Sequence, residues 1–529
     1  MIDDDSGAEM QIAIGDVTGE LPTEQRMRQF SLVIMVLLFA IQAKTQDYTL
    51  HTFKKIQLSD KFWSEGAAVA DVNRDGHLDI VSGPYWYEGP DFKRRHEIFP
   101  ATQTFTLKKA DGAEVQIEGY EGAFGKKNAY SHVFLEFAFD FNHDGWPDVL
   151  TIDVPTVASS SIVATWYENP GKEGLAKGAS WQAHIAFDAM GNESPTLADL
   201  FGDGRPVLLC TSGDLLGYVA PDWNNPREKW TFHAISYPLP MLVDLREKFS
   251  KHFGGRPWPY SHGLGFGDVN GDGRRDILEA EGWWEQPALV QGDPVWKFHK
   301  WSFLANRPAG AMAHISPDTI TPEQVTALMH SYEWPFELGG AQIYVYDVNG
   351  DGFPDIVSSL NAHGHGLAWF EQLPARDSSG EIQFKPHIIM GDTPNDNKYG
   401  VEFTQLHALQ LVDIDGDGLK DIVTGKRFWA HGPNGPDPDS NGPAVLYWFK
   451  LVREHDGGVD FVPYSIDNDS GVGTQFVTAD VNGDGLPDII IGNKKGTFLF
   501  LQQVKHVSRA EWERAQPKPR STAASPSNP

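Results

Sequence analysis

The sequence predicts an all-β fold in which one four-stranded unit is repeated seven times, and three observations lead to this prediction. A nine-residue acidic loop, read as DVNGDGFPD from Asp347 to Asp355, returns roughly every 60 to 80 residues. A short apolar run precedes each loop and a β-branched run follows it, which is typical of a hairpin. An aromatic run and a run that contains histidine then complete each unit. Four strands repeated seven times predict a seven-bladed β-propeller.

The acidic loops have the side-chain pattern of a calcium site. Oxygen-bearing side chains occupy positions 1, 3, 5 and 9, and a glycine at position 6 permits the sharp turn. The predicted calcium ligands are Asp71, Asn73, Asp75, Asp79, Asp140, Asn142, Asp144, Asp148, Asp268, Asn270, Asp272, Asp276, Asp347, Asn349, Asp351, Asp355, Asp413, Asp415, Asp417, Asp421, Asp480, Asn482, Asp484 and Asp488. The remaining copy begins at Asp199 and has Phe201 and Val207 at two of these positions, so we expect it to bind no ion.

The third and fourth runs of each unit predict its outer strands. The third run is aromatic and ends in glutamate, as in Trp86-Tyr87-Glu88. In the fourth run, a histidine follows each of the first five loops, and these are His96, His184, His233, His299 and His387. Tyr464 takes this place after the sixth loop. We expect these recurrent histidines to be structural. No such run follows the last loop, whereas residues 48–56 resemble one, so we expect the N-terminal strand to complete the last blade.

The loops and their flanks, over about residues 48–503, resemble the FG-GAP or VCBS repeats of integrin α-subunit propellers and of many secreted bacterial proteins. Four stretches also look similar to the propeller domain of aldos-2-ulose dehydratase, a sugar lyase: YSHGLGFGDVNGDG from Tyr260, AHGHGLAWFEQ from Ala362, LHALQLVDIDGDGLKDIVTGKRFWAHG from Leu406 and SGVGTQFVTADVNGDG from Ser470. The cupin domains of that enzyme have no counterpart in this chain. The resemblance implies a propeller fold, and the narrower one implies a carbohydrate as substrate.

Charge and cysteine content exclude some functions. The chain has 43 Lys and Arg against 72 Asp and Glu, a formal net charge of −29, which argues against a nucleic-acid partner. Much of the negative charge lies in the loops, where calcium would offset it. The single cysteine, Cys210, excludes an intramolecular disulfide. Ions and packing between blades are therefore expected to hold the fold together.

The chain ends differ in composition from the 44–515 region that we assign to the propeller. Residues 27–43 contain Arg28, an apolar run from Phe30 to Ile41 and a small residue, Ala43, which together predict a secretory signal peptide and a secreted or periplasmic protein. An uncleaved short anchor is the alternative, but the apolar run is too short for a stable membrane span. We interpret residues 1–26 as a mis-assigned upstream extension, and residues 516–529 as a disordered tail.

Long insertions separate several of the predicted blades, around residues 100–131, 236–261, 302–340 and 391–405. Two of them are predicted to contain short helices, one from Met241 and one that begins at Thr321 and Pro322. If each acidic loop joins the first and second strands on one face, these insertions all lie on the opposite face. Long loops in a compact domain are usually functional, so we expect the site on that face.

The candidate site follows from polar residues that only some units carry. Residues about six to eight positions before each first aspartate are expected to line the mouth of the central channel, because the first strand of a blade is innermost. The candidates there are Glu65, His132, Glu193, His262 and His407, and the second-to-third connections add His363, His365, Lys426 and Arg427, with Tyr85, Trp86 and Trp283 as surfaces for sugar stacking. Several imidazoles and a carboxylate are ligands for a zinc-like ion. Each residue taken alone fits a hydrogen-bonded channel residue better than a site residue, and it is the expected convergence of these residues that favours a functional site.

Two functions from different classes fit these residues. The first is a carbon-oxygen lyase, a dehydratase that eliminates water from a keto-sugar: a cation polarises the carbonyl, a histidine or glutamate removes the adjacent proton, and Lys426 and Arg427 stabilise the enolate. The second is a non-catalytic propeller that binds glycans or proteins. A Ser-His-Asp hydrolase is a weaker third hypothesis because the sequence has no GxSxG motif.

Overall fold

The computed structural model describes residues 48–101, 104–108, 114–118, 133–153, 162–213, 215–237, 262–303, 339–340, 342–433, 435 and 437–520. The chain divides into two compact units, one of residues 1–50 with 505–515 and one of residues 51–504 with 516–529. The predicted extension, signal peptide and insertion helices lie outside the described residues, as does His132.

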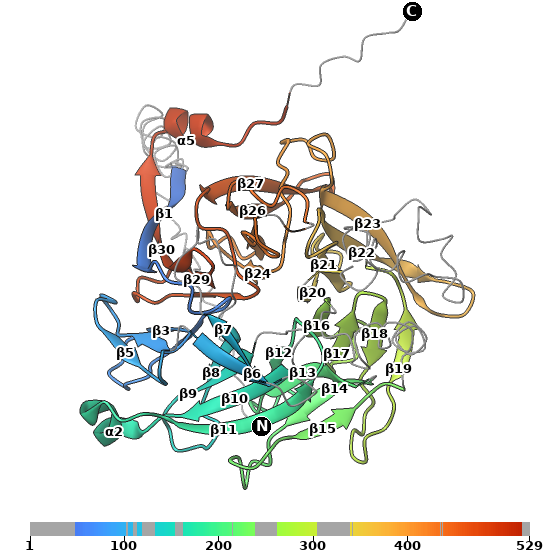
Figure 1. Ribbon diagram of the computed structural model, residues 1–529. Helices are drawn as coiled ribbons and strands as arrows, with labels where there is room; N and C mark the ends of the chain where they lie inside the picture. The colour runs from blue at the N-terminus through green and yellow to red at the C-terminus, as the bar shows by residue number, and fades with distance from the viewer. Residues whose placement is uncertain are drawn as a thin grey trace, which may run out of the picture. The chain divides into compact units, whose positions relative to one another are not determined.

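Five separate four-stranded sheets are present (Figure 1). In chain order the first contains β2 (Ala68–Ala70), β3 (Asp79–Ser82), β4 (Tyr85–Tyr87) and β5 (Arg95–Glu97), and the second contains β8 (Val133–Phe139), β9 (Asp148–Asp153), β10 (Ile162–Glu168) and β11 (Gln182–Met190). The third contains β12 (Thr196–Ala198), β13 (Val207–Ser212), β14 (Leu215–Ala220) and β15 (Thr231–Ala234), and a further sheet contains β24 (Leu409–Val412), β25 (Asp421–Gly425), β26 (Leu446–Arg453) and β27 (Val459–Asp467).

The last sheet combines the two ends of the repeat region. Its strand order is β28 (Phe476–Ala479), β29 (Asp488–Asn493), β30 (Gly496–Val507) and β1 (Tyr48–Ser59). The strand expected to complete the last blade is β1, and it is the hydrogen-bonded neighbour of β30. The outer edge of β30 is therefore covered by a strand from the start of the chain.

The fourth and fifth repeat units form one eight-stranded sheet, so the prediction of a seven-bladed propeller is corrected: in the described residues, five units form separate four-stranded blades and the other two share this sheet. This sheet contains β16 (Leu264–Gly267), β17 (Asp276–Glu279), β18 (Gly282–Glu285), β19 (Lys297–Lys300), β20 (Gln342–Tyr346), β21 (Asp355–Ser359), β22 (Leu367–Arg376) and β23 (Ile382–Met390). The two halves join where β16 pairs in parallel with β20. Glycines allow this approach, because a Cβ atom on Gly265 would lie 2.0 Å from the Ile343 carbonyl oxygen.

Few other elements occur in the described parts of the chain. A separate two-stranded sheet pairs β6 (Thr104–Lys108) with β7 (Glu114–Glu118). The two short helices are α2 (Gly171–Lys177) and α5 (Arg509–Ala515). Neither helix is long and apolar enough to cross a membrane.

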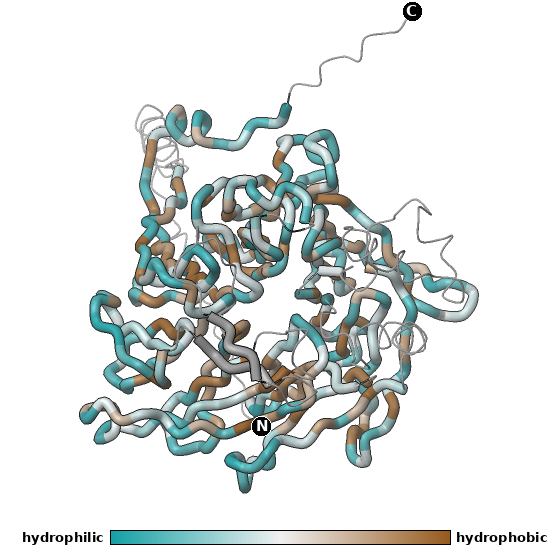
Figure 2. The backbone as a smooth tube through the Cα atoms, in the orientation of Figure 1, coloured by the Kyte–Doolittle hydropathy of each residue, from teal (hydrophilic) through white to brown (hydrophobic). Residues whose placement is uncertain are grey.

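Apolar packing joins each sheet of the larger unit to its neighbour. Hydrophobic residues follow the strands, and the turns between them are hydrophilic (Figure 2). Val81 of the first sheet shares a buried cluster with Val149 of the second, and Ile490 of the last sheet shares another with Ile80 of the first. The first and last repeat units therefore pack against each other. The result is an all-β, propeller-like fold with the first strand of each unit innermost.

Candidate functional site

The acidic loops share one hydrogen-bond pattern. In the first loop, the Asp71 carboxylate accepts the backbone N–H groups of Asp75 and Gly76 at 3.0 Å each, and the buried Asp79 carboxylate accepts those of Val72 and Gly89 at 2.8 Å each. Burial raises the pKa of the ninth-position aspartate in all six full loops, from about 6 at Asp488 to about 8 at Asp148, and the neighbouring loop carboxylates raise it further. A divalent cation would stabilise these ionised carboxylates, so the loops fit calcium.

Two loops depart from this pattern. In the sixth loop, Asp415 replaces the asparagine of the other full copies, and the ammonium group of Lys450 pairs with Asp415 and with Asp417, the latter at 2.8 Å. Asp413, Asp415 and Asp421 each direct one carboxylate oxygen to within 4.8 Å of the others. In the altered loop, Asp199 pairs with Arg275 at 3.5 Å. In both of these loops, a positively charged side chain of the protein, Lys450 or Arg275, therefore pairs with a loop carboxylate.

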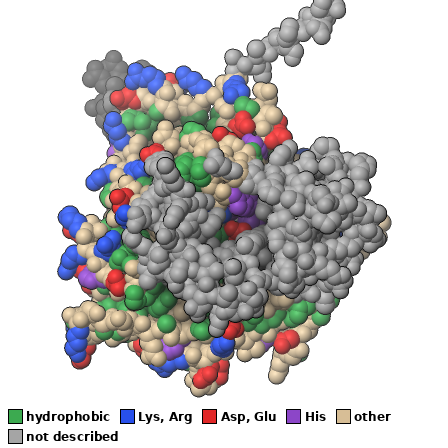
Figure 3. Space-filling view, in the orientation of Figure 1, with side chains coloured by type: hydrophobic (Ala, Val, Ile, Leu, Met, Phe, Trp, Pro, Cys, Tyr) green, Lys and Arg blue, Asp and Glu red, His purple; other side chains and the backbone are tan. Residues whose placement is uncertain are grey.

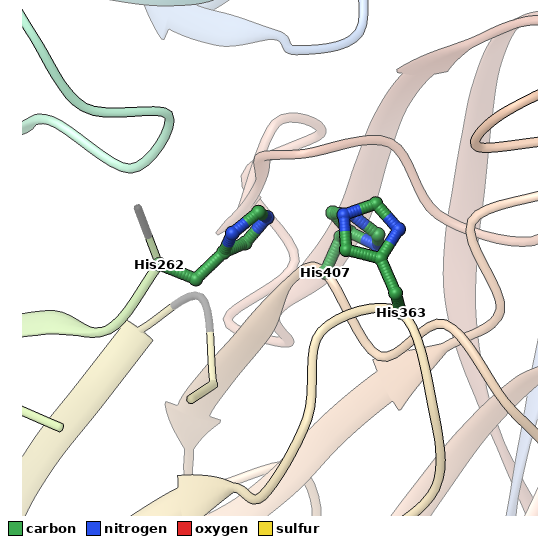
Figure 4. A group of neighbouring side chains, drawn as sticks. All are labelled: His262, His363 and His407. Atoms are coloured by element: carbon green, nitrogen blue, oxygen red, sulfur yellow. The ribbon is translucent and has the colours of Figure 1, made fainter. Parts of the chain in front are cut away.

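Three histidines from different repeat units converge in the larger unit, at the ends of the strands opposite the acidic loops (Figure 4). His262 directly precedes β16, His407 precedes β24, and His363 lies in the connection between β21 and β22. Each offers one ring nitrogen to a group whose atoms all lie within 4.8 Å of one another. The Nε2 atoms of His363 and His407 are 3.3 Å apart. Two nitrogen ligands at 2.0–2.1 Å from a tetrahedral zinc ion are separated by about 3.3 Å, so this pair has the spacing of metal ligands.

A carboxylate behind the cluster orients His363. Asp437 lies in the connection between β25 and β26 and contacts Nδ1 of His363 at 3.1 Å and Nδ1 of His431 at 3.0 Å. Because Nδ1 of His363 donates to the carboxylate, Nε2 keeps its lone pair and faces His407. His431 stacks on His363 with ring centroids 4.5 Å apart, and 35% of its side chain is exposed. A carboxylate that accepts the second ring N–H of a histidine is the usual way in which a protein orients a metal-binding imidazole.

An ion-pair network adjoins the histidines on the other side. Arg427 contacts the Glu65 carboxylate at 2.9 and 3.2 Å and the Glu193 carboxylate at 3.3 Å. Glu193 in turn lies 3.4 Å from Nε2 of His262. The ammonium group of Lys494 is 3.8 Å from Glu65 and donates to the Ala430 carbonyl at 3.0 Å. These charged side chains are almost fully buried, so each depends on its partners for stabilisation.

The pKa shifts in the cluster follow from burial and from these partners. Burial, followed by the charges of His363 and Arg427, lowers the pKa of His407 well below its usual range, so the imidazole is neutral near pH 7. A neutral imidazole is the form that binds a metal. Burial opposes ionisation of Glu193, but His262 and Arg427 outweigh it and lower the pKa of Glu193. Burial also lowers the pKa of Lys494 to about 7.

Three of the seven non-glycine residues with a positive φ angle in the described parts of the chain lie in the same connections. Gln405, Trp429 and Asp439 have φ angles of 64°, 55° and 51°, in the left-handed region that residues with a Cβ atom rarely adopt. Residues are held in such conformations only where surrounding contacts stabilise them, and they gather at functional sites.

The structure brings together only some of the residues predicted from sequence. Six of them belong to the histidine cluster and its ion-pair network: Glu65, Glu193, His262, His363, His407 and Arg427. They are buried and do not form an exposed rim, since only 1% of His407 and 7% of His262 is accessible. Histidine and acidic side chains are nevertheless visible near the middle of the face shown in Figure 3.

The other predicted residues have structural partners elsewhere. Trp86 and Trp283 are buried in their sheets, stacked on His96 and His299 with centroids 4.1 and 3.9 Å apart, so neither offers a surface to a sugar. Tyr85 stands edge-on to Trp63.

Two further predicted residues are engaged by carboxylates outside the cluster. Lys426 pairs with Asp439 at 2.8 Å and so does not face a substrate beside Arg427. His365 pairs with Glu402 at 3.2 Å.

Sequence analysis missed three members of the site: Asp437, His431 and Lys494. Lys494 lies six residues after Asp488, as Arg427 does after Asp421, so its position in the repeat could have identified it. His431 and Asp437 occupy no recurrent position, and their one signal is that they lie in the longest connection between a second and a third strand among the described strands, in a segment rich in glycine and proline. Contact between that segment and His363 depends on the fold and could not be read from spacing.

Comparison with protein-family models finds a match to one short part of the chain. Residues 472–500 match the FG-GAP repeat. No curated protein sequence matches the chain.

The chain also resembles solved structures at low identity. The rhamnogalacturonan lyase YesW is 14% identical, with 85% of this chain and 72% of that chain covered and a TM-score of 0.34. The exotype rhamnogalacturonan lyase YesX is 12% identical over the same shares, also with a TM-score of 0.34. The V. cholerae biofilm matrix protein Bap1 is 11% identical, with 88% and 82% covered and a TM-score of 0.28.

Proposed function

We propose that the protein is a metal-dependent carbon-oxygen lyase that eliminates water from a keto-sugar, with its ion held by His262, His363 and His407. The observation that carries the proposal is the convergence of three imidazoles from separate repeat units on one point, with Asp437 fixing the tautomer of His363. A bound divalent ion of the zinc type supplies Lewis acidity toward a substrate carbonyl. The assignment of substrate class rests on the narrower sequence resemblance.

The residues beside the histidines supply the groups that an elimination needs. Glu193 is ionised and lies at the edge of the imidazole cluster, so it is the group that accepts the proton next to the carbonyl. Arg427 is fixed by Glu65 and contacts Glu193, so its guanidinium stabilises negative charge that develops on the substrate oxygen. His431 donates Nδ1–H to Asp437, so in its doubly protonated form the other ring nitrogen carries the proton that the leaving hydroxyl group takes up.

We also propose that calcium ions bind the six full acidic loops and that the protein acts outside the cytoplasm. The support for calcium is the shared arrangement of carboxylates and their raised pKa values. Support for a secreted or periplasmic location comes from residues 27–43 and from the millimolar calcium that loops of this type require in extracellular modules.

The test is an elimination assay on the metal-reconstituted full chain. Metal-stripped protein, reloaded with zinc or with manganese, is mixed with a panel of keto-sugars, and formation of an unsaturated ketone is followed by ultraviolet absorbance. We expect a metal-dependent reaction that Glu193→Gln and His262→Ala abolish and that His184→Ala, in an outer strand, retains.

Two results would redirect the proposal. Glycan binding without turnover in the wild type would favour a non-catalytic binding propeller. Turnover that is unchanged in Glu193→Gln would show that the proton acceptor lies elsewhere.

A further inference from the structure

Gln405 occupies a central place behind the metal cluster. It lies at the end of the insertion that precedes β24, two residues before His407, and its side chain is fully buried. Its φ angle of 64° is unfavourable for a residue with a Cβ atom, and neither of its neighbours in the chain is a glycine that could share the turn. A buried residue keeps this conformation only if its contacts offset the cost.

The backbone of Gln405 ties together three segments that carry site residues. Its N–H donates to the carbonyl of Gly364, the neighbour of His363, at 2.9 Å. Its own carbonyl accepts the backbone N–H groups of His407 and Arg427, each at 2.9 Å. The left-handed conformation turns this carbonyl toward both donors, so the strained φ angle is what allows these two hydrogen bonds to form.

The side chain of Gln405 reaches the remaining part of the site. Its Oε1 atom accepts the N–H of Ala430 at 3.3 Å, and its Nε2 atom donates to the carbonyl of Pro438 at 3.3 Å. Ala430 precedes His431, and Pro438 follows Asp437. One amide thus bridges the residues on either side of the segment that carries His431 and Asp437.

We propose that Gln405 is a positioning residue that sets the mutual orientation of His363, His407 and Asp437, and thereby the affinity and coordination geometry of the metal centre. The inference rests on the proposed metal centre. Gln405 contacts none of the imidazoles and acts through the backbone of the segments that hold them. Residues that support metal ligands in this way typically change metal affinity 10- to 100-fold when they are replaced.

Glutamine is the residue type that meets these requirements. Its amide oxygen accepts the N–H group of Ala430, and its amide nitrogen donates to the carbonyl of Pro438. Glutamate has the same length but no donor when ionised. Glycine tolerates the backbone conformation better but lacks the side-chain contacts.

The experiment is a cobalt titration of the full chain after removal of bound metal, with calcium present throughout. Co²⁺ affinity and the visible absorption spectrum of bound Co²⁺ are measured for the wild type, Gln405→Glu, Gln405→Gly and the control Gln410→Glu. Gln410 lies on β24 and bonds to the Phe476 carbonyl, away from the histidines. We expect roughly 10- to 100-fold weaker binding and an altered spectrum in both Gln405 variants, and wild-type behaviour in the control.

The glycine variant separates positioning from a purely structural role. Because glycine relieves the backbone strain, Gln405→Gly is expected to fold even if Gln405→Glu does not, and to bind Co²⁺ weakly all the same. Folded Gln405 variants with wild-type affinity and spectrum would overturn the inference while leaving the metal centre intact. A wild type that binds no Co²⁺ would overturn the metal centre and the inference with it.

Discussion

The molecule contains two sets of histidines that differ in what their ring nitrogens contact. In the outer strands, His96, His184, His299 and His387 each contact the glutamate of the preceding strand at 2.7–2.9 Å and stack on a tryptophan. At the centre, His262, His363 and His407 direct ring nitrogens at one another. An outer histidine directs its ring nitrogen at a carboxylate and stacks on an aromatic ring, whereas each central histidine also directs a ring nitrogen at the other two, an arrangement that a metal ion would stabilise.

The comparison separates scaffold from site. The Trp, Glu and His contact recurs in four units because every unit must join its third and fourth strands. The central contacts occur once, because each repeat unit contributes a different residue. Changes to the recurrent features should therefore alter the free energy of unfolding and leave metal binding unchanged. Changes to the central histidines should abolish metal binding and leave the free energy of unfolding nearly unchanged.

Removal of calcium is the largest perturbation of the recurrent features. A site at ten times its dissociation constant contributes about 1.4 kcal/mol, so several loops together contribute several kcal/mol. We expect excess calcium chelator to lower the melting temperature strongly, and restored calcium to reverse the change. An unchanged melting temperature would show that the loops do not depend on calcium.

Arg427→Ala tests the one place where the centre itself carries stability. The substitution leaves the carboxylates of Glu65 and Glu193 buried without their main cation, which typically costs ~3–5 kcal/mol of unfolding free energy. The control is Arg94→Ala: Arg94 pairs with Glu88, but 75% of its side chain is exposed, so we expect a loss of no more than ~1 kcal/mol. Equal losses in denaturant titrations of both variants would mean that the Glu65 and Glu193 carboxylates are stabilised by other groups.

His184→Ala and His299→Ala are expected to have a smaller effect. Each removes a ring that packs on tryptophan and pairs with glutamate, so unfolding free energy should fall by ~1–3 kcal/mol, with bound metal unchanged. Thermal melts and metal analysis on the same samples check this. Loss of metal in these variants would erase the distinction between the two sets.

The recurrent features could be predicted from the sequence because repetition makes a signal visible. Six copies of the acidic loop and the recurrent Trp, Glu and His positions indicate strands, turns and an all-β repeat fold. The number of separate sheets could not be predicted, because the parallel pairing of β16 with β20 depends on the small volume of Gly265 and Gly267 beside β20.

The candidate site was only partly predictable. Glu65, Glu193, His262 and His407 could be found because they precede a first strand, a position that the repeat defines. Asp437 and His431 lie in a long connection where no register relates one unit to another. Lys494 shares the repeat position of Arg427 and could have been found by that relation. Trp86 and Trp283 were assigned to the site because aromatic residues bind sugars, but in this fold their rings are used by the outer histidines.

Elemental analysis of the purified full chain, dialysed against calcium buffer after mild chelation, tests the central claim most directly. We predict about one equivalent of a transition metal in the wild type and in His184→Ala, and none in His363→Ala, because each of the three imidazoles supplies a ligand. Calcium content should be the same in all three proteins. A wild type that holds calcium alone, or an equal transition-metal content in His363→Ala, would contradict the account.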